Sequence, residues 1–207
     1  MIKIAKLYFR YGTMASGKSL EIYKIYDNYK RQGKRAICFV PDVVGETKSR
    51  IGLKAPSIKF KTDSDLWYLT TRHLPVDCVL VDEIQFITKQ HVLQLVNIVD
   101  VMKIPVIGFG LKTTFKGTIF EGSYWMLVYA DKIEEVKTVC QFCNAKATMV
   151  LRIENGKPIY DGPEIQIKKK GQMDYLPVCR KCWIKPDLNK MESLFTMQNK
   201  KDSMSVK

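Results

Sequence analysis

The first 110 residues alternate between short apolar runs and longer stretches with helical periodicity. Residues 4–11 alternate apolar and polar side chains up to Gly12, which predicts a strand that leads into a glycine loop. Residues 18–31 carry apolar side chains at helical spacing, and Gly33 follows as a stop signal. We therefore expect a strand, a loop and a helix in that order.

Three further apolar runs, residues 36–40, 76–81 and 104–109, are short enough to be buried strands. Between the last two, residues 89–102 carry a helical apolar stripe. Strands that alternate with helices are typical of a parallel sheet with helices on both faces. The sequence therefore predicts an α/β fold for residues 1–135.

The pattern changes after about residue 135. Short β segments are predicted at 136–139, 147–153 and 157–160, with a turn at Glu154-Asn155-Gly156 and no helix-length stripe. We interpret residues 136–186 as a small β-rich domain. Residues 187–207 are polar and rich in lysine, so we expect a disordered basic tail.

The chain has 34 basic and 21 acidic residues, a formal net charge of +13. This excess could indicate nucleic-acid binding, but the lysines are dispersed and no nucleic-acid-binding motif accompanies them, which favours a solvated surface that attracts nucleotides. No apolar run reaches the roughly 18 residues that a membrane span needs, and no signal segment is found. We expect a cytoplasmic protein without a membrane partner.

Residues 12–19 fit the phosphate-loop pattern G-x-x-x-x-G-K-[ST], between a predicted strand and a predicted helix. Such a loop turns successive backbone N–H groups toward an anion at a helix N-terminus. Lys18 is expected to reach the β- and γ-phosphates of ATP, and the Ser19 hydroxyl to bind Mg²⁺. The whole loop forms the candidate ATP site: Gly12, Thr13, Met14, Ala15, Ser16, Gly17, Lys18 and Ser19.

Two carboxylates, Asp82 and Glu83, end the apolar run at 76–81, which we take as the third strand. We expect this strand to lie beside the one that leads into the phosphate loop. Asp82 is then placed to hold Mg²⁺, while Glu83 points to the other side of the strand and can take a proton from an attacking hydroxyl. These residues indicate a P-loop phosphotransferase or NTPase without naming the acceptor.

Four of the six cysteines form two C-x-x-C pairs, Cys140/Cys143 and Cys179/Cys182. Two such pairs can close a tetrahedral Cys₄ shell around a structural zinc ion, with a long loop between them. A redox motif or two unrelated thiol pairs are the alternatives. The other two, Cys38 and Cys78, lie in apolar runs and are expected to be inert core residues.

Taken together, these motifs resemble the type II thymidine kinases, the zinc-containing class of animals, many bacteria and large DNA viruses. The resemblance covers about residues 4–184. Beyond the phosphate loop and the cysteines, it rests on the order and spacing of DEIQF (82–86), GLKTTF (110–115), FEGS (120–123), ATMVLR (147–152) and YLPVCRKC (175–182). It implies a P-loop kinase domain (1–135) and a zinc-binding "lasso" domain (136–186).

The resemblance implies that Glu83 is the general base for the 5′-hydroxyl of thymidine, and that Asp42, Asp82 and Gln85 join the ATP and Mg²⁺ set. It implies a substrate pocket made of Met14, Phe86, Leu111, Phe115, Phe120, Ile167, Gly171 and Tyr175. It further implies a homotetramer and feedback inhibition by dTTP.

The sequence departs from the family pattern in the lasso and after the second strand. Residues 167–171 read IKKKG where the family usually has Gly-Gly, and the stretch to Tyr175 is about two residues longer. Asp42-Val43-Val44 lacks the arginine of an Asp-x-Arg motif, and Arg50 is a candidate to replace it. The loop at 43–48 is short, and Cys182 stands where many members have His.

We expect a thymidine kinase that transfers the γ-phosphate of ATP, with deoxyuridine as a second substrate. A nucleic-acid-stimulated P-loop ATPase with a zinc ribbon is the alternative, and it would use the positive charge for binding. A third hypothesis is a binding protein that keeps the fold without turnover, favoured only by the missing arginine near Val44.

Overall fold

The computed structural model describes residues 5–43, 55–164, 173–187 and 189–190. Arg50, Ile167, Gly171 and nearly all of the predicted tail lie outside the described residues. The chain forms two compact units: one comprises Met1–Gly12, Gly17–Lys112 and Ile119–Val136, and the other Thr13–Ser16, Thr113–Thr118 and Lys137–Lys207. Within the described ranges, no helix is long and apolar enough to cross a membrane.

The larger unit is built on a six-stranded parallel sheet with the strand order β3-β2-β4-β5-β1-β6. The residues of β2 and β4 are all buried, which is typical of parallel strands covered on both faces. The strands are β1 (Leu7–Tyr11), β2 (Ala36–Pro41), β3 (Ile58–Phe60), β4 (Cys78–Val81), β5 (Val106–Gly110) and β6 (Lys132–Glu135).

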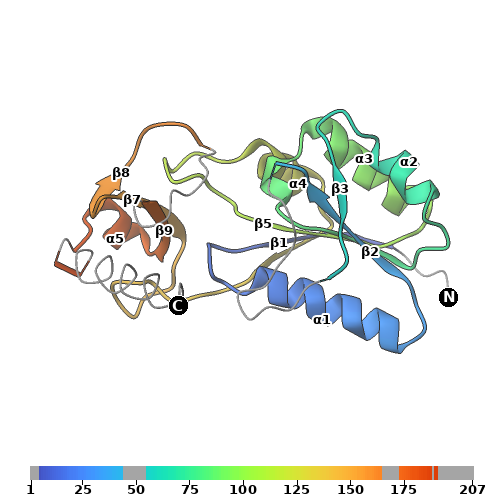
Figure 1. Ribbon diagram of the computed structural model, residues 1–207, viewed down its shortest axis with the longest axis horizontal. Helices are drawn as coiled ribbons and strands as arrows, with labels where there is room; N and C mark the ends of the chain where they lie inside the picture. The colour runs from blue at the N-terminus through green and yellow to red at the C-terminus, as the bar shows by residue number, and fades with distance from the viewer. Residues whose placement is uncertain (1–4, 44–54, 165–172, 188, 191–207) are drawn as a thin grey trace, which may run out of the picture. The chain divides into compact units, whose positions relative to one another are not determined.

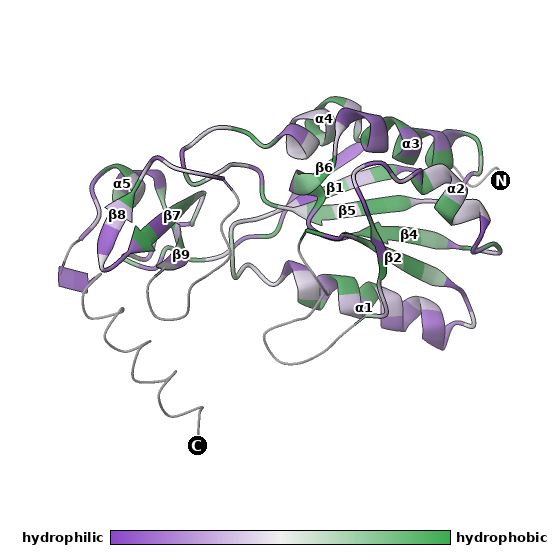
Figure 2. Ribbon diagram, turned by 45° about the horizontal axis from the view of Figure 1, so that its top comes forward, coloured by the Kyte–Doolittle hydropathy of each residue, from purple (hydrophilic) through white to green (hydrophobic). Residues whose placement is uncertain are grey.

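Helices cover both faces of this sheet (Figure 1). Helix α1 (Lys18–Arg31) packs on one face, where Ile22 joins a core with Cys38, Cys78 and Phe109. On the other face lie α2 (Leu66–Thr71), α3 (Lys89–Asp100), α4 (Glu121–Tyr129) and the short 3-10 helix η1 (Ile84–Phe86). Figure 2 shows the sheet as predominantly hydrophobic, while α1 is mixed and becomes polar toward its C-terminal end. The predicted fold class is confirmed.

All six strands run in the same direction, so their carboxyl ends meet at one edge of the sheet. Gly12 follows β1, Asp42 follows β2, Asp82 follows β4 and Leu111 follows β5. The expectation that the Asp82 strand lies beside the phosphate-loop strand is wrong, because β5 pairs with both and separates them. That strand is also the fourth along the chain, since β3 precedes it.

The strongly periodic segments were predictable, and the short or atypical ones were missed. Helix α1 has the predicted bounds, and α3 ends two residues before the predicted limit at 102. Strand β3 is only three residues long, and β6 (KIEE) is mostly charged. Helix α4 is apolar on several sides and exposes Tyr124, Val128 and Tyr129, so it lacks a clear amphipathic stripe.

The smaller unit contains a three-stranded antiparallel sheet with the order β8-β7-β9. Its elements are β7 (Met149–Glu154), β8 (Lys157–Ile159), β9 (Met173–Val178) and the helix α5 (Arg180–Ile184). Asn155 and Gly156 have φ of 48° and 73°, which confirms the predicted turn, and it joins β7 and β8 as a hairpin. The predicted strand at 136–139 is wrong: Val139 forms an isolated bridge with Lys146, and the chain then turns back through Cys140–Cys143.

Three glycines let η1 pack against its neighbours in the larger unit. A Cβ atom on Gly108 would collide with Ile84 Cδ1, and one on Gly110 would collide with Gln85 Oε1. On α4, a Cβ at Gly122 would collide with the carbonyl oxygen of Ile84 and lie 2.8 Å from that of Ile87. The turn after β4 therefore depends on the absence of side chains at these positions.

We predict that Gly122→Ala lowers the free energy of unfolding by about 2–3 kcal/mol, because rigid backbone carbonyls cannot yield to the new methyl group. Urea denaturation followed by circular dichroism measures the change. Gly156→Ala is the matched control: no atom lies within 4 Å of its Cβ position, so only the positive φ is unfavourable, at about 1 kcal/mol. Equal losses in the two variants would contradict the packing argument.

Candidate active site and metal centre

The phosphate loop contains two residues in the left-handed region. Ala15 has φ of 61° and Gly17 has φ of 92°, and the N–H of Ser16 donates to the carbonyl of Thr13 at 3.4 Å. Left-handed residues within a tight loop are the backbone condition for an anion-binding nest. Helix α1 begins directly afterwards, with Gly17 as its N-cap.

Lys18 starts helix α1, and its side chain is buried. It is 9% exposed, and its Nζ donates to the carbonyl oxygen of Gly12 at 3.2 Å. The ammonium group therefore lies against Gly12, the first residue of the phosphate loop. A lysine in this arrangement supplies a positive charge at the loop that a triphosphate can use.

Asp82 is 3% exposed at the carboxyl end of β4. Its backbone N–H donates to Phe39 on β2 at 2.9 Å, and its Oδ1 accepts from the N–H of Glu83 at 2.9 Å. A buried carboxylate at this edge of the sheet can hold a divalent cation. The matching position after β2 is Asp42, whose N–H donates to the carbonyl of Phe60 at 2.8 Å while its side chain is exposed.

Glu83 is half-buried and leaves the strand direction, with φ of 52° and ψ of 41°. The expectation that it simply points to the opposite side of the strand from Asp82 is therefore wrong. Strand β4 ends at Val81, and the left-handed residue turns the chain into η1. A left-handed, non-glycine residue is uncommon and is found disproportionately at functional sites.

Gln85 connects Glu83 to the end of β5. Its Nε2 donates to Glu83 Oε2 at 2.5 Å, and its Oε1 accepts from the backbone N–H of Leu111 at 2.9 Å. Gln85 is 3% exposed, while both of its partners are half-buried. The N–H of Leu111 determines which end of the amide faces Glu83, and the carboxylate is thereby oriented.

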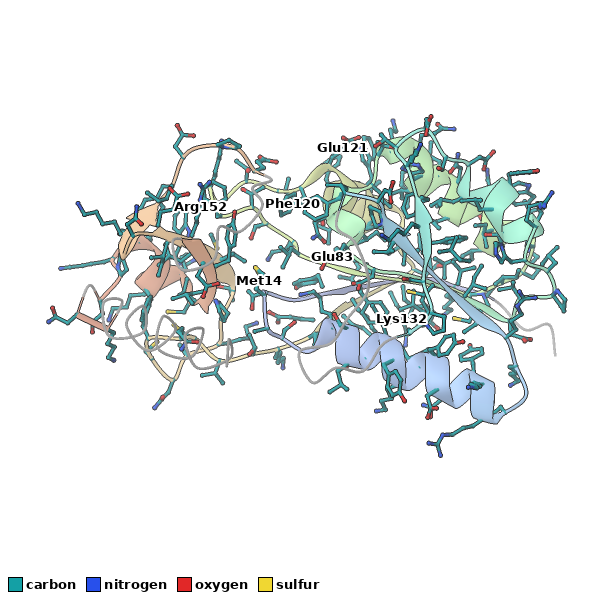
Figure 3. All side chains as sticks on the ribbon, viewed as in Figure 1. Met14, Glu83, Phe120, Glu121, Lys132 and Arg152 are labelled. Atoms are coloured by element: carbon teal, nitrogen blue, oxygen red, sulfur yellow. The ribbon has the colours of Figure 1, made fainter. Side chains whose placement is uncertain are left out.

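The predicted pocket residues of the larger unit lie on neighbouring elements. The rings of Phe86 and Phe120 meet edge to face with centroids 5.7 Å apart. Leu111 is half-buried, and its carbonyl accepts from the buried hydroxyl of Ser123 at 2.5 Å. Figure 3 labels Glu83 and Phe120 among the side chains of this unit.

In the smaller unit, the predicted residues Phe115 and Tyr175 pack together, with ring centroids 6.2 Å apart at 60°. Arg152 joins them: its guanidinium carbon lies 5.0 Å from the Phe115 centroid, and on β7 it is paired with Tyr175 of β9. Burial raises the pKa of Tyr175, while the charge of Arg152 acts to lower it.

Arg152 was missed by the motif analysis, although an arginine inside the apolar run at 147–153 was a signal. It is 2% exposed, donates to the carbonyl of Pro163 at 3.3 Å and forms an ion pair with Glu154. Figure 3 shows it on the smaller unit. Met14, grouped with the same unit, is half-buried. Ile167 and Gly171 lie outside the described residues.

The four cysteines of the two C-x-x-C pairs converge, and their sulfur atoms all lie within 4.8 Å of one another. Cys143 Sγ is 3.8 Å from both Cys179 Sγ and Cys182 Sγ. Four sulfurs placed about 2.3 Å from a central zinc ion form a tetrahedron with edges of about 3.8 Å. The residues present therefore fit a Cys₄ zinc site.

Backbone N–H groups donate to two of the four sulfur atoms. The N–H of Phe142 donates to Cys140 Sγ at 3.5 Å, and that of Cys182 donates to Cys179 Sγ at 3.5 Å. Burial acts to raise the pKa of Cys140, but hydrogen bonds from neighbouring backbone N–H groups outweigh it and lower the pKa to about 7. By contrast, Cys38 and Cys78 are both 0% exposed in the core of the larger unit.

Comparisons with known proteins give a consistent result. A family model described as thymidine kinase matches residues 5–183. The chain is 51% identical to the thymidine kinase of Shouchella clausii (strain KSM-K16) over 192 residues, which cover 89% of this chain and 99% of that protein. It is 47% identical to the thymidine kinase of Streptococcus gordonii over 192 residues, covering 90% of this chain and all of that protein.

We predict that the purified protein contains one zinc ion per chain and that Cys143→Ser loses it. The melting temperature should fall by roughly 10 °C, which corresponds to about 3 kcal/mol for a chain of this size. Metal analysis and differential scanning fluorimetry measure the two effects. Cys78→Ala is the control, because it removes a core thiol and should keep the zinc. Full zinc content in Cys143→Ser would rule out the four-cysteine site.

Proposed function

The chain belongs to the thymidine kinase family, and on that premise we propose that it transfers the γ-phosphate of ATP to the 5′-hydroxyl of thymidine, giving ADP and dTMP. The observation that carries the proposal is the arrangement at the sheet edge. A phosphate loop, a buried aspartate and a hydrogen-bonded glutamate follow parallel strands whose carboxyl ends lie together. Phosphoryl transfer needs these parts for the donor, the metal and the attacking alcohol.

In this proposal, the phosphate loop binds the triphosphate through the backbone N–H groups of residues 12–19 and through Lys18. Ser19 and Asp82 would hold Mg²⁺, with Asp42 as a further carboxylate near the same edge. The metal supplies positive charge that offsets the charge on the transferring phosphoryl group. Cys140, Cys143, Cys179 and Cys182 would hold a zinc ion that stabilises the fold of the smaller unit and takes no part in the reaction.

Glu83 is the proposed general base. Its carboxylate accepts the proton of the 5′-hydroxyl as the alcohol oxygen forms a bond to the γ-phosphorus. The bond from the γ-phosphorus to the β–γ bridging oxygen breaks, and ADP leaves with that oxygen. Gln85, bonded on both sides, holds the carboxylate in one orientation and so lowers the entropy cost of reaching the reactive geometry.

We assign the thymine base to a set of aromatic and apolar side chains. Phe115 and Tyr175 present the rings, and the other proposed contacts are Met14, Phe86, Leu111, Phe120, Ile167 and Gly171. We also propose a division of the chain into a kinase domain at 1–135, a lasso domain at 136–186 and a basic tail at 187–207.

We extend the proposal to deoxyuridine as a second substrate, dTTP as a feedback inhibitor and a homotetrameric assembly. These follow from the family alone. A cytosolic location is also proposed, and it is supported by the four cysteines, because thiolate ligands persist in a reducing compartment. The positive charge is assigned to attraction of nucleotides and not to nucleic-acid binding.

The first test incubates the purified protein with [γ-³²P]ATP and each of the four deoxynucleosides. We expect labelled dTMP from thymidine and little product from the purine nucleosides. Glu83→Gln should bind thymidine with nearly unchanged affinity but lose about 10³-fold or more in kcat. Wild-type protein that hydrolyses ATP only when single-stranded DNA is added would refute the kinase assignment, and unchanged turnover in Glu83→Gln would refute the base.

The second test concerns Gln85. Gln85→Leu keeps most of the side-chain volume but removes the donor to Glu83 and the acceptor for the Leu111 N–H. We expect kcat to fall about ten- to a hundredfold, as for the loss of a hydrogen bond to a charged group, with a smaller change in the KM for ATP. Steady-state kinetics measures both. Gln90→Leu, on the exposed start of α3, is the control. A raised ATP KM with unchanged kcat would instead place Gln85 at the nucleotide.

A further inference from the structure

The segment Thr113–Thr118, which carries Phe115, is grouped with the smaller unit although the chain on both sides of it belongs to the larger one. It closes on itself through the N–H of Thr114, which donates to the carbonyl of Thr118 at 2.8 Å. We call these six residues the aromatic loop. A short turn like this has no core of its own, so its position depends on what holds it.

Trp183 of helix α5 holds the backbone of the aromatic loop. Its indole Nε1 donates to the carbonyl oxygen of Phe115 at 3.1 Å. Gly117, with φ of 83°, lets the ring approach closely, since a Cβ there would lie 3.3 Å from Trp183 Cη2. The bond reaches Phe115 itself, so it acts directly on the residue proposed to contact thymine.

The other attachments of the loop differ in kind. Arg152 and Tyr175 contact the Phe115 ring, and Lys116 pairs with Asp161 at 3.2 Å. Asp161 is 97% exposed in that pair, and exposed ion pairs contribute little. The ring contacts have no hydrogen-bond direction. The indole bond, by contrast, is a directional side-chain contact to the Phe115 backbone.

The position of Trp183 follows from the cysteine cluster. Helix α5 spans Arg180–Ile184, has Cys179 as its N-cap and includes Cys182 directly before Trp183. The N–H of Trp183 donates to the carbonyl of Cys179 at 2.9 Å. From the other side, the hydroxyl of Tyr160 donates to the carbonyl of Trp183 at 2.6 Å, and the two rings meet edge to face. A helix of five residues is too short to be stable alone, so the cysteines determine where the indole lies.

We propose that Trp183 is a positioning residue that transmits the rigidity of the cysteine cluster to Phe115 and thereby determines affinity for the pyrimidine base. The inference rests on the proposed function, in which Phe115 contacts thymine. It assigns the cluster a role in nucleoside binding in addition to its role in folding. Because Trp183 neither touches the phosphates nor moves a proton in this scheme, its loss should change binding of one substrate only.

The test uses Trp183→Phe in the full-length, zinc-loaded protein, since phenylalanine keeps an aromatic ring and removes the N–H donor. We expect the KM for thymidine to rise about five- to tenfold, as for one lost hydrogen bond, with kcat within about twofold and the KM for ATP unchanged. Hydrogen exchange of the peptide that covers the aromatic loop should be faster. Trp67→Phe, on α2 of the larger unit, is the matched control and should alter none of these.

Several outcomes would overturn the inference. These are an unchanged thymidine KM with unchanged exchange, a fall in kcat alone, and equal rises in both KM values. If Trp183→Phe loses zinc, Tyr160→Phe is the second variant, because it removes the hydroxyl bonded to Trp183 and leaves the indole and the cysteines intact. We expect Tyr160→Phe to raise the KM for thymidine alone by about twofold or more. An unchanged KM for thymidine in this variant refutes the proposal. Wild-type protein without thymidine kinase activity would instead refute the proposed function, and loop exchange would still report on the Trp183 contact.

Discussion

The larger unit depends on the close approach of the 3-10 helix η1 to β5 and α4. Because Gly108, Gly110 and Gly122 have no side chains there, Ile84 and Gln85 can pack directly against those elements. This approach places Gln85 within reach of both Leu111 and Glu83. The orientation of the proposed base is therefore a consequence of core packing, and a methyl group on any of the three glycines would act on the site as well as on stability.

In the smaller unit, side chains are held in position by a different physical means. Its apolar core is small, and buried Cys140 and Cys179 form part of it together with Phe142, Leu151 and Val178. Small units of this kind are commonly stabilised by a metal. If the four sulfurs share a zinc ion, the cluster fixes the positions of β7, β9 and α5. Side chains of β7 and β9 contact the ring of Phe115, and Trp183 of α5 donates to its backbone carbonyl. In the proposed function, base recognition and phosphoryl transfer then rely on separate sources of rigidity.

The parts of the fold that could be predicted are those with strong local signals. Helix α1 and the strands around it follow from apolar spacing and from glycine stops, and the hairpin turn at Asn155-Gly156 follows from its residue types. Helix α4 and strand β6 could not be predicted, because an evenly apolar helix and a charged edge strand have no periodic pattern. The position of β5 between β1 and β4 could not be predicted either, because strand order depends on pairing between segments that are distant in the chain.

The sequence by itself determined the chemistry of this protein: the phosphate loop, the Asp82-Glu83 pair, the two cysteine pairs and the family are all contained in local spacing. These motifs can be recognised in the sequence because each is made of residues that are close together along the chain. Only the tertiary structure decided that Glu83 turns away from its strand, that Gln85 bridges it to Leu111, and that Arg152 and Trp183 meet at Phe115. Those contacts join residues distant in the chain, and their geometry follows from packing that no local pattern records.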